Sequence, residues 1–182
     1  MLRITIPGSS ELWDEEKQEF LPATKDVTIQ LEHSLVSLSR WESKWNKAFL
    51  KKEEKTTEEV IDYVRCMTVT QGVSPEVYHR LSQENLTQIN DYIGAPMTAT
   101  YFRDDKIMGH GRETVTSELI YYWMIALNIP FECQKWHLNR LFALIKVCSI
   151  KNAPPKKVNK AEAARRYAEL NAARRRKYHT KG

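Results

Sequence analysis

No run of apolar residues in this sequence is long enough to cross a membrane. A membrane-spanning helix needs about twenty consecutive apolar residues. The most apolar stretch, residues 119–148, is interrupted by Asn128, Pro130 and several charged or amide side chains. The first residues show no charged segment followed by a long apolar one, so we expect no signal peptide. These absences indicate a soluble protein that stays in the cytoplasm and has no membrane partner.

Cysteine is scarce as well. The chain has three cysteines, Cys66, Cys133 and Cys148, and no C-x-x-C pair. An odd number of cysteines in a chain that stays inside a cell is best explained by reduced, mostly buried thiols. We therefore expect no structural disulfide.

The sequence also lacks the short motifs of common enzymes. It contains no G-x-S-x-G, no phosphate-binding glycine loop and no H-E-x-x-H. Cys133 and His137 are four residues apart and would share a helix face, but only His110 suggests a third metal ligand. The favoured interpretation is a buried cysteine beside a hydrogen-bonded histidine. We predict no enzyme activity, no metal site and no cofactor.

The charge is divided between the two ends of the chain. The formal net charge is +5, from 28 Lys and Arg against 23 Asp and Glu. Eleven of the basic residues and only two of the acidic ones lie in residues 151–182, which gives this segment +9 and leaves −4 for residues 1–150. The basic isoelectric point of about 9.0 is therefore a property of the tail. It does not indicate that the folded part binds nucleic acid.

The residue pattern near the start predicts two strands. Apolar and polar residues alternate over 2–6 and again over 27–31, as in strands with one buried face. We expect them to pair as an antiparallel hairpin. The acidic segment between them, residues 11–26, is expected to be an irregular loop from which Trp13 and Phe20 fold back onto the body.

The pattern then changes to the period of an α-helix. We predict helices over residues 35–50, capped by Ser34, and over 58–69, capped by Thr56 or Thr57. A short helix with Pro75 in its first position precedes one that opens at 82–85 and ends at Gly94. A further pair, starting at Thr114 or Thr116 and joined by a turn at 128–130, is predicted to form an antiparallel helical hairpin that is the core.

These elements predict an α+β protein that is mainly helical. The N-terminal β-hairpin packs on a helical body, and a basic C-terminal helix or tail follows. The composition changes after Asn152, where Ala153–Lys157 reads as a linker. We therefore divide the chain into a globular body, residues 1–152, and an Ala- and Arg-rich tail, residues 153–182, that is helical or disordered.

Two groups of side chains are candidates for partner binding. Aromatic residues that become buried on binding dominate interface energies, although at helical spacing such residues are more often core. The aromatic candidates are Trp41, Trp45, Trp123 and Trp136. In the tail, arginines can contact phosphates or an acidic protein partner, or can simply be solvated; these are Arg165, Arg166, Arg174, Arg175 and Arg176. Nucleic acid is not the favoured partner, because no aromatic stacking array or helix-turn-helix pattern accompanies the charge.

Four long segments of the chain resemble the tail assembly chaperones of long-tailed bacteriophages, which are encoded near the tape measure protein. They are LEHSLVSLSRWESKWNKAFL (31–50), TTEEVIDYVRCMTV (56–69), ELIYYWMIALNIPFECQKWHLNRLFALIKVC (118–148) and the ending NAPPKKVNKAEAARRYAELNAARRRKYHTKG. Together they cover most of the chain.

The resemblance implies a role without catalysis. Tail assembly chaperones bind the tape measure protein, keep it soluble and help to recruit tail tube subunits. They act in the host cell cytoplasm and are absent from the finished virion. Many are made in a short and a frameshifted longer form, so a longer form of this chain is a further implied partner. Two alternatives stay open: a nucleic-acid-binding phage protein that uses the basic tail, and a structural head–tail or tail component of the virion.

Overall fold

The computed structural model describes residues 1–8, 12–14, 19–21, 24–102, 114–154 and 160–179. Its internal contacts divide the chain into two compact units, Met1–Ile150 and Lys151–Gly182. The first unit holds the strands and most of the helices, and it confirms the expected α+β, mainly helical fold.

Two antiparallel strands form the main sheet of the first unit. β1 (Leu2–Ile6) pairs with β4 (Val27–Leu31), with Leu2 opposite Leu31 and Ile6 opposite Val27. The inward side chains of both strands are buried, as the alternating pattern predicts; they are Ile4, Ile6, Ile29 and Leu31. The predicted hairpin packed on a helical body is therefore present.

The segment between these strands contains a second hairpin. β2 (Leu12–Asp14) pairs antiparallel with β3 (Glu19–Leu21), and Trp13 lies opposite Phe20 in the register. The expectation of an irregular connection was wrong. Each of the two strands is only three residues long, and the acidic residues of the segment obscure so short an alternating pattern. The expected contact of Trp13 and Phe20 with the body concerns side chains outside the described part of the structure.

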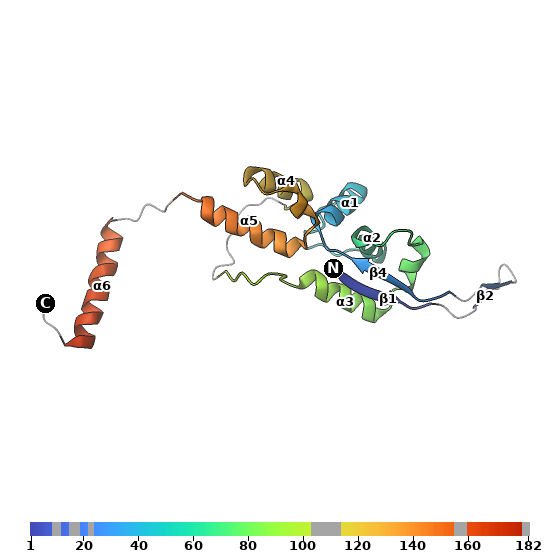
Figure 1. The fold of residues 1–182 in the computed structure, drawn as a ribbon, viewed down its shortest axis with the longest axis horizontal. Coiled ribbons are helices and arrows are strands. Elements are labelled where there is room, and N and C mark those ends of the chain that lie inside the picture. The colour runs from blue at the N-terminus through green and yellow to red at the C-terminus, as the bar shows by residue number, and fades with distance from the viewer. Residues whose placement is uncertain (9–11, 15–18, 22–23, 103–113, 155–159, 180–182) are drawn as a thin grey trace. The chain divides into compact units, whose positions relative to one another are not determined.

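Both edges of the β1–β4 sheet are covered. Along β4, the Glu32 N–H donates to the Met67 carbonyl at 2.9 Å and the Val69 N–H donates to the Gln30 carbonyl at 2.8 Å. On the β1 side, where α3 runs beside the strand (Figure 1), the Asn85 amide donates to the Thr5 carbonyl at 3.2 Å. These bonds occupy part of each edge and leave fewer backbone groups free to pair with another chain.

The helices begin where the capping residues predict. The α-helices are α1 (Leu35–Trp45), α2 (Thr57–Met67), α3 (Gln83–Gly94), α4 (Ser117–Ala126), α5 (Leu138–Asn152) and α6 (Lys160–Tyr178), and the 3-10 helices are η1 (Pro75–Arg80) and η2 (Phe131–Lys135). Ser34, Thr56, Ser82 and Thr116 are the N-caps of α1 to α4, each accepting a backbone N–H from the first turn. No helix in the described segments combines the length and apolar character needed to cross a bilayer.

Two helix boundaries differ from the prediction. α1 ends at Trp45 because Asn46 adopts the left-handed conformation, with φ of 53°, and its N–H donates to the Glu42 carbonyl. The segment after Pro130 forms the 3-10 helix η2, and α5 begins only at Leu138. Apolar spacing alone does not reveal these interruptions, since the apolar residues continue at helical intervals through both.

The core consists of two clusters rather than one. We call the first cluster the strand core, and it lies between the sheet, α2, η1 and α3. Its buried side chains are Ile4, Ile6, Ile29, Leu31, Trp41, Tyr63, Val64, Met67, Val77, Tyr78, Ile89 and Tyr92. The helix core contains Leu35, Leu38, Ile120, Met124, Ile129, Cys133, Leu138, Leu141 and Ile145. The helical hairpin predicted to be the core thus supplies only the second cluster. α1 contributes to both clusters.

A buried carboxylate on α1 connects this helix to segments distant in sequence. Glu42 is 7% exposed. Its Oε1 accepts the Phe49 N–H at 2.9 Å, and its Oε2 accepts the Ser117 N–H, in the first turn of α4, at 2.7 Å. Both carboxylate oxygens therefore satisfy backbone donors that the fold has removed from water.

We expect Glu42→Ala to lower the free energy of unfolding by about 2 to 6 kcal/mol, because it leaves a buried and a partly buried N–H without an acceptor, at about 1 to 3 kcal/mol each. Glu42→Gln keeps one acceptor oxygen and should lose less. Urea unfolding at neutral pH measures both. Glu53→Ala is the control, because Glu53 is 58% exposed in a surface ion pair with Lys51 and should change stability by less than about 1 kcal/mol. Equal losses for Glu42→Ala and Glu53→Ala would contradict the assignment.

Candidate functional site

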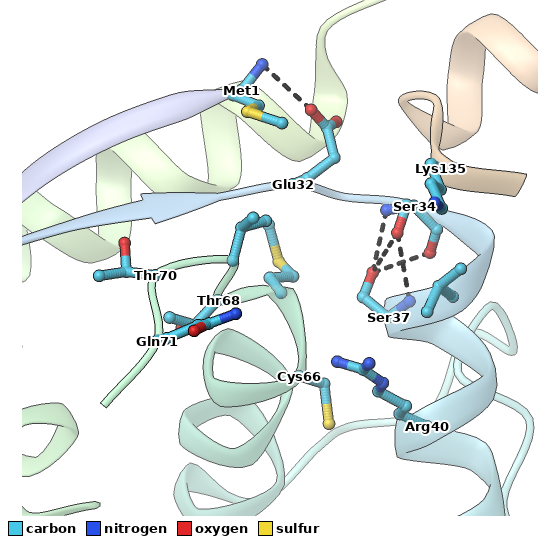
Figure 2. A pocket seen from close by; sticks show the side chains of 13 residues that line it. Met1, Glu32, Ser34, Ser37, Arg40, Cys66, Thr68, Thr70, Gln71 and Lys135 are labelled. Carbon is cyan, nitrogen blue, oxygen red and sulfur yellow. Dashed lines mark hydrogen bonds and ion pairs between the residues drawn. The ribbon is translucent and has the colours of Figure 1, made fainter. Parts of the chain in front are cut away.

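A polar pocket lies between α1, the end of β4 and the chain that follows α2 (Figure 2). We call it the α1 pocket. Its volume is about 490 Å³, and the side chains that define its chemistry are Glu32, Ser37, Arg40, Cys66, Thr70 and Lys135. A smaller hollow of about 330 Å³ shares Arg40 and Cys66 with it and adds Lys44, Asp62 and Arg65.

Glu32 is the only carboxylate among the described residues that line the α1 pocket, and it is already paired. Glu32 Oε2 lies 3.1 Å from the Met1 amino group, and Glu32 Oε1 accepts the Tyr92 O–H at 2.7 Å. Burial and the contact with Glu32 raise the pKa of Tyr92, so this phenol stays protonated and donates. Burial likewise raises the pKa of the Cys66 thiol, which argues against a reactive thiolate in the pocket.

Two buried histidines lie where the strand core meets the helix core. The rings of His33 and His137 are 5.2 Å apart, and the side chains are 2% and 5% exposed. His137 Nε2 lies 2.9 Å from the Tyr92 carbonyl and must donate to it, while Nδ1 accepts the Asn139 N–H at 3.3 Å. His137 is therefore held as the neutral Nε2–H tautomer.

His33 is equally shielded from water. Its Nδ1 lies 2.6 Å from the Tyr63 hydroxyl, and its backbone carbonyl accepts the Leu138 N–H at 2.7 Å. Burial, with a smaller contribution from nearby His137, lowers the pKa of His33 to about 4. Burial also lowers the pKa of His137. As neutral rings, His33 and His137 are suited to holding two parts of the fold together. They are poorly suited to proton transfer.

Cys133 and His137 do not share a helix face. Cys133 belongs to η2, whereas His137 follows this 3-10 helix and precedes α5. Both ring nitrogens of His137 are engaged in the hydrogen bonds given above, and His110 lies outside the described residues. Within the described part of the chain, no three His, Cys, Asp or Glu side chains are grouped so that they could hold a metal ion.

Two of the four candidate tryptophans connect α1 to α2. Trp41 is 1% exposed, and its Nε1–H donates to the Glu59 carbonyl at 2.9 Å. Trp45 is half-buried and donates to Asp62 Oδ2 at 3.0 Å. Lys44 pairs with the same carboxylate at 2.5 Å. In this conformation Trp41 offers no surface to a partner, and Trp45 offers only part of its ring.

The other two tryptophans pack against the helix core. Trp123 and Trp136 are both half-buried. The Arg140 guanidinium lies 4.2 Å from the centre of the Trp136 ring, within the range of a cation–π contact. Each exposes a smaller fraction of its surface than Tyr122, Ile125 or Phe131 of α4 and η2.

The exposed apolar side chains of α4 and η2 were not among the residues predicted to bind a partner. Tyr122 is 62% exposed, Ile125 60% and Phe131 53%. We call these three side chains the α4–η2 surface. Tyr122 and Ile125 are three residues apart and share a helix face. Exposed acidic side chains, Glu118 and Glu132, flank them in sequence.

A signal for this surface was present in the sequence. Residues 119–125 are all apolar, and one face of a surface helix cannot bury so many consecutive apolar side chains. The surface is also held in place. Tyr121 donates its O–H to Gln134 Oε1 at 2.9 Å, and its ring lies 6.4 Å from that of Phe131, so η2 is fixed against α4.

The second unit contains the basic helix α6. Every residue of it whose side chain is described, from Ala164 to Tyr178, is exposed, including all five candidate arginines. Arg174 to Lys177 are consecutive and therefore point to all sides of the helix. Tyr167, Leu170 and Tyr178, 68%, 48% and 65% exposed, fall close to one face.

Comparison with known proteins finds no relative of this chain. No protein-family model, no curated protein and no solved structure matches this chain.

We expect stability to fall as the pH is lowered from about 6.5 to 4. The folded pKa of His33, about 4, is below its ordinary value of 6.5, so the unfolded chain binds the proton first. The resulting loss is about 2 to 3 kcal/mol at pH 4.5, since one pKa unit corresponds to about 1.4 kcal/mol. Urea unfolding at pH 7.0, 5.5 and 4.5 measures it.

Two variants test whether His33 causes this loss of stability at low pH. His33→Gln should reduce the fall in stability between pH 6.5 and 4.5 by about 2 to 3 kcal/mol, and the buried His137, whose pKa is also lowered, contributes to the part that remains. His79→Gln, which removes an exposed histidine, should leave it unchanged. A His33→Gln profile parallel to that of the parent protein would show that other groups cause the acid sensitivity.

Proposed function

We propose that this protein is a phage tail assembly chaperone that binds the tape measure protein and acts without catalysis. In this role it works in the host cell cytoplasm, assists the recruitment of tail tube subunits and leaves before the virion is complete. The observation that carries the proposal is the exposed apolar α4–η2 surface. The resemblance of the segments described above to tail assembly chaperones supplies the identity of the client.

The chemistry of the α4–η2 surface suits an amphipathic helix. Tyr122, Ile125 and Phe131 can contact the apolar stripe of such a helix, a mode in which side chains one turn apart enter a shared groove. Aromatic side chains contribute most of the energy of such interfaces. The neighbouring Glu118 and Glu132 favour a client with basic residues beside its apolar stripe.

The basic helix α6 has a different part in this proposal. Its arginines are exposed, and residues 151–182 carry a net charge of +9. Charge of this kind raises the rate of encounter with an acidic partner and makes binding sensitive to salt, while the apolar contacts set the lifetime of the complex. We assign α6 to attraction of acidic regions of the client or of tail tube subunits.

The same helix supports an alternative function. Exposed arginines on all sides of a helix would also bind the phosphates of nucleic acid, with a steep dependence on salt. In that case removal of residues 153–182 should abolish DNA binding. A structural role in the virion is the other alternative, and mass spectrometry of purified virions tests it directly.

We expect Ile125→Asp to weaken binding to tape measure fragments at least tenfold, because it places a charge on the apolar α4–η2 surface. The matched control is Ile150→Asp, the same change at a residue 45% exposed on α5, which should change affinity less than about twofold. Calorimetric titration of the full-length variants measures both dissociation constants, and circular dichroism checks that each is folded.

Deletion of residues 153–182 gives the complementary result. The shortened protein should still copurify with the tape measure protein but associate more slowly and with a weaker salt dependence. If neither form retains the tape measure protein while the full-length form binds DNA tightly, the chaperone proposal is wrong. If Ile125→Asp and Ile150→Asp bind equally well, the α4–η2 surface is not the contact.

A further inference from the structure

The α1 pocket contains basic side chains that have no partner among the residues that the structure describes. Arg40 and Lys135 both line it, and neither forms an ion pair or hydrogen bond with any described residue through its side chain. Glu32 is the one acidic side chain in the described part of the lining, and it is engaged by the Met1 amino group and the Tyr92 hydroxyl. The pocket therefore has an excess of positive charge.

The adjoining hollow has the same imbalance. Arg65 lines it beside Arg40 and is likewise without an ion pair to a described residue. The acidic group there, Asp62, is taken by Lys44 at 2.5 Å and by the Trp45 indole at 3.0 Å. The two hollows share Arg40 and Cys66, so Arg40 contributes positive charge to both.

Hydrogen-bonding groups and apolar side chains complete the lining. The Thr70 hydroxyl accepts the Gln30 N–H at 2.9 Å and keeps its own hydrogen for another acceptor. The Gln71 amide lies nearby in the pocket wall (Figure 2), and Val36 supplies apolar contact. A volume of about 490 Å³ lies within the range of small-molecule sites.

We propose that the α1 pocket binds a small organic anion through its phosphate or carboxylate group. Arg40 is the principal contact, because a guanidinium donates two parallel hydrogen bonds to the oxygens of either group. Lys135 adds a second positive charge from η2, and Thr70 and Gln71 supply donors on the opposite wall. This site is separate from the α4–η2 surface and does not depend on the chaperone proposal.

The first experiment titrates full-length, ¹⁵N-labelled protein with inorganic phosphate, AMP and succinate at constant ionic strength. Binding in the α1 pocket should shift the amide signals of Ser37 and of residues 68–71. AMP binding with no response to succinate would identify a phosphate ligand, and the reverse a carboxylate ligand. Shifts confined to α6, or none with any of the three probes, would overturn the proposal.

The second experiment repeats the titration with charge-neutral variants. Arg40→Gln should raise the dissociation constant for the probe that binds at least tenfold, and Lys135→Gln by about threefold. Arg166→Gln removes an equal charge from α6 and Lys52→Gln from an exposed loop, so both should change it less than twofold. Equal weakening by all four variants would show that only net charge matters and that the pocket is not a site. Because Arg40 and Lys135 are exposed and make no ion pair or hydrogen bond to a described residue through their side chains, their replacement should leave the protein folded.

Discussion

The fold depends on one helix being shared by two hydrophobic clusters. Leu35 and Leu38 of α1 are fully buried in the helix core, and Trp41, one turn further on, is buried in the strand core. Burial of each such side chain stabilises the folded state by about 1.5 to 3 kcal/mol. Since the same rigid helix carries all three, displacement of α1 from one cluster would disturb the other.

Polar contacts fix the position of α1 between the clusters. Ser34 and Ser37 form a reciprocal capping box at its start, Glu42 satisfies backbone donors of two other segments, and Trp41 donates to the backbone of α2. At its other end, Lys47 pairs with the buried Glu59 at 2.5 Å. This contact lowers the pKa of Glu59, as does the hydrogen bond from the Thr56 N–H. Buried polar groups that are fully paired specify a single arrangement, because any other leaves them unsatisfied.

The features that could be predicted from the sequence are those with local signals. Ser34, Thr56 and Ser82 precede apolar residues at helical spacing, and each caps the expected helix. The strands β1 and β4 follow from alternation over five residues each. A cap or an alternating strand is determined by residues within about one turn or a few positions, so the chain itself contains the information.

The features that could not be predicted depend on partners far along the chain. In the sequence, Glu42 is one more acidic residue on a predicted helix. Its role as a buried acceptor depends on Ser117, which is 75 positions away. His33 looks unremarkable until Tyr63 and His137 surround it. The candidate site had the same difficulty: periodicity shows which side chains share a helix face, but not which face another element covers. Trp41 is therefore covered, whereas Tyr122 and Ile125 are not.

The hydrogen bond from the Leu138 N–H to the His33 carbonyl has a consequence for synthesis of the chain. Ribosomes extend proteins at about 5 to 20 residues per second, so the N-terminal strands emerge well before Leu138 exists. During those seconds the end of β4 and the first turn of α1 have no α5 to pack against, and Leu35 and Leu38 remain in water. In this interval the nascent chain exposes apolar side chains that later become part of the helix core. In that interval the chain is exposed to aggregation, because apolar side chains that are not yet buried can associate with those of other chains.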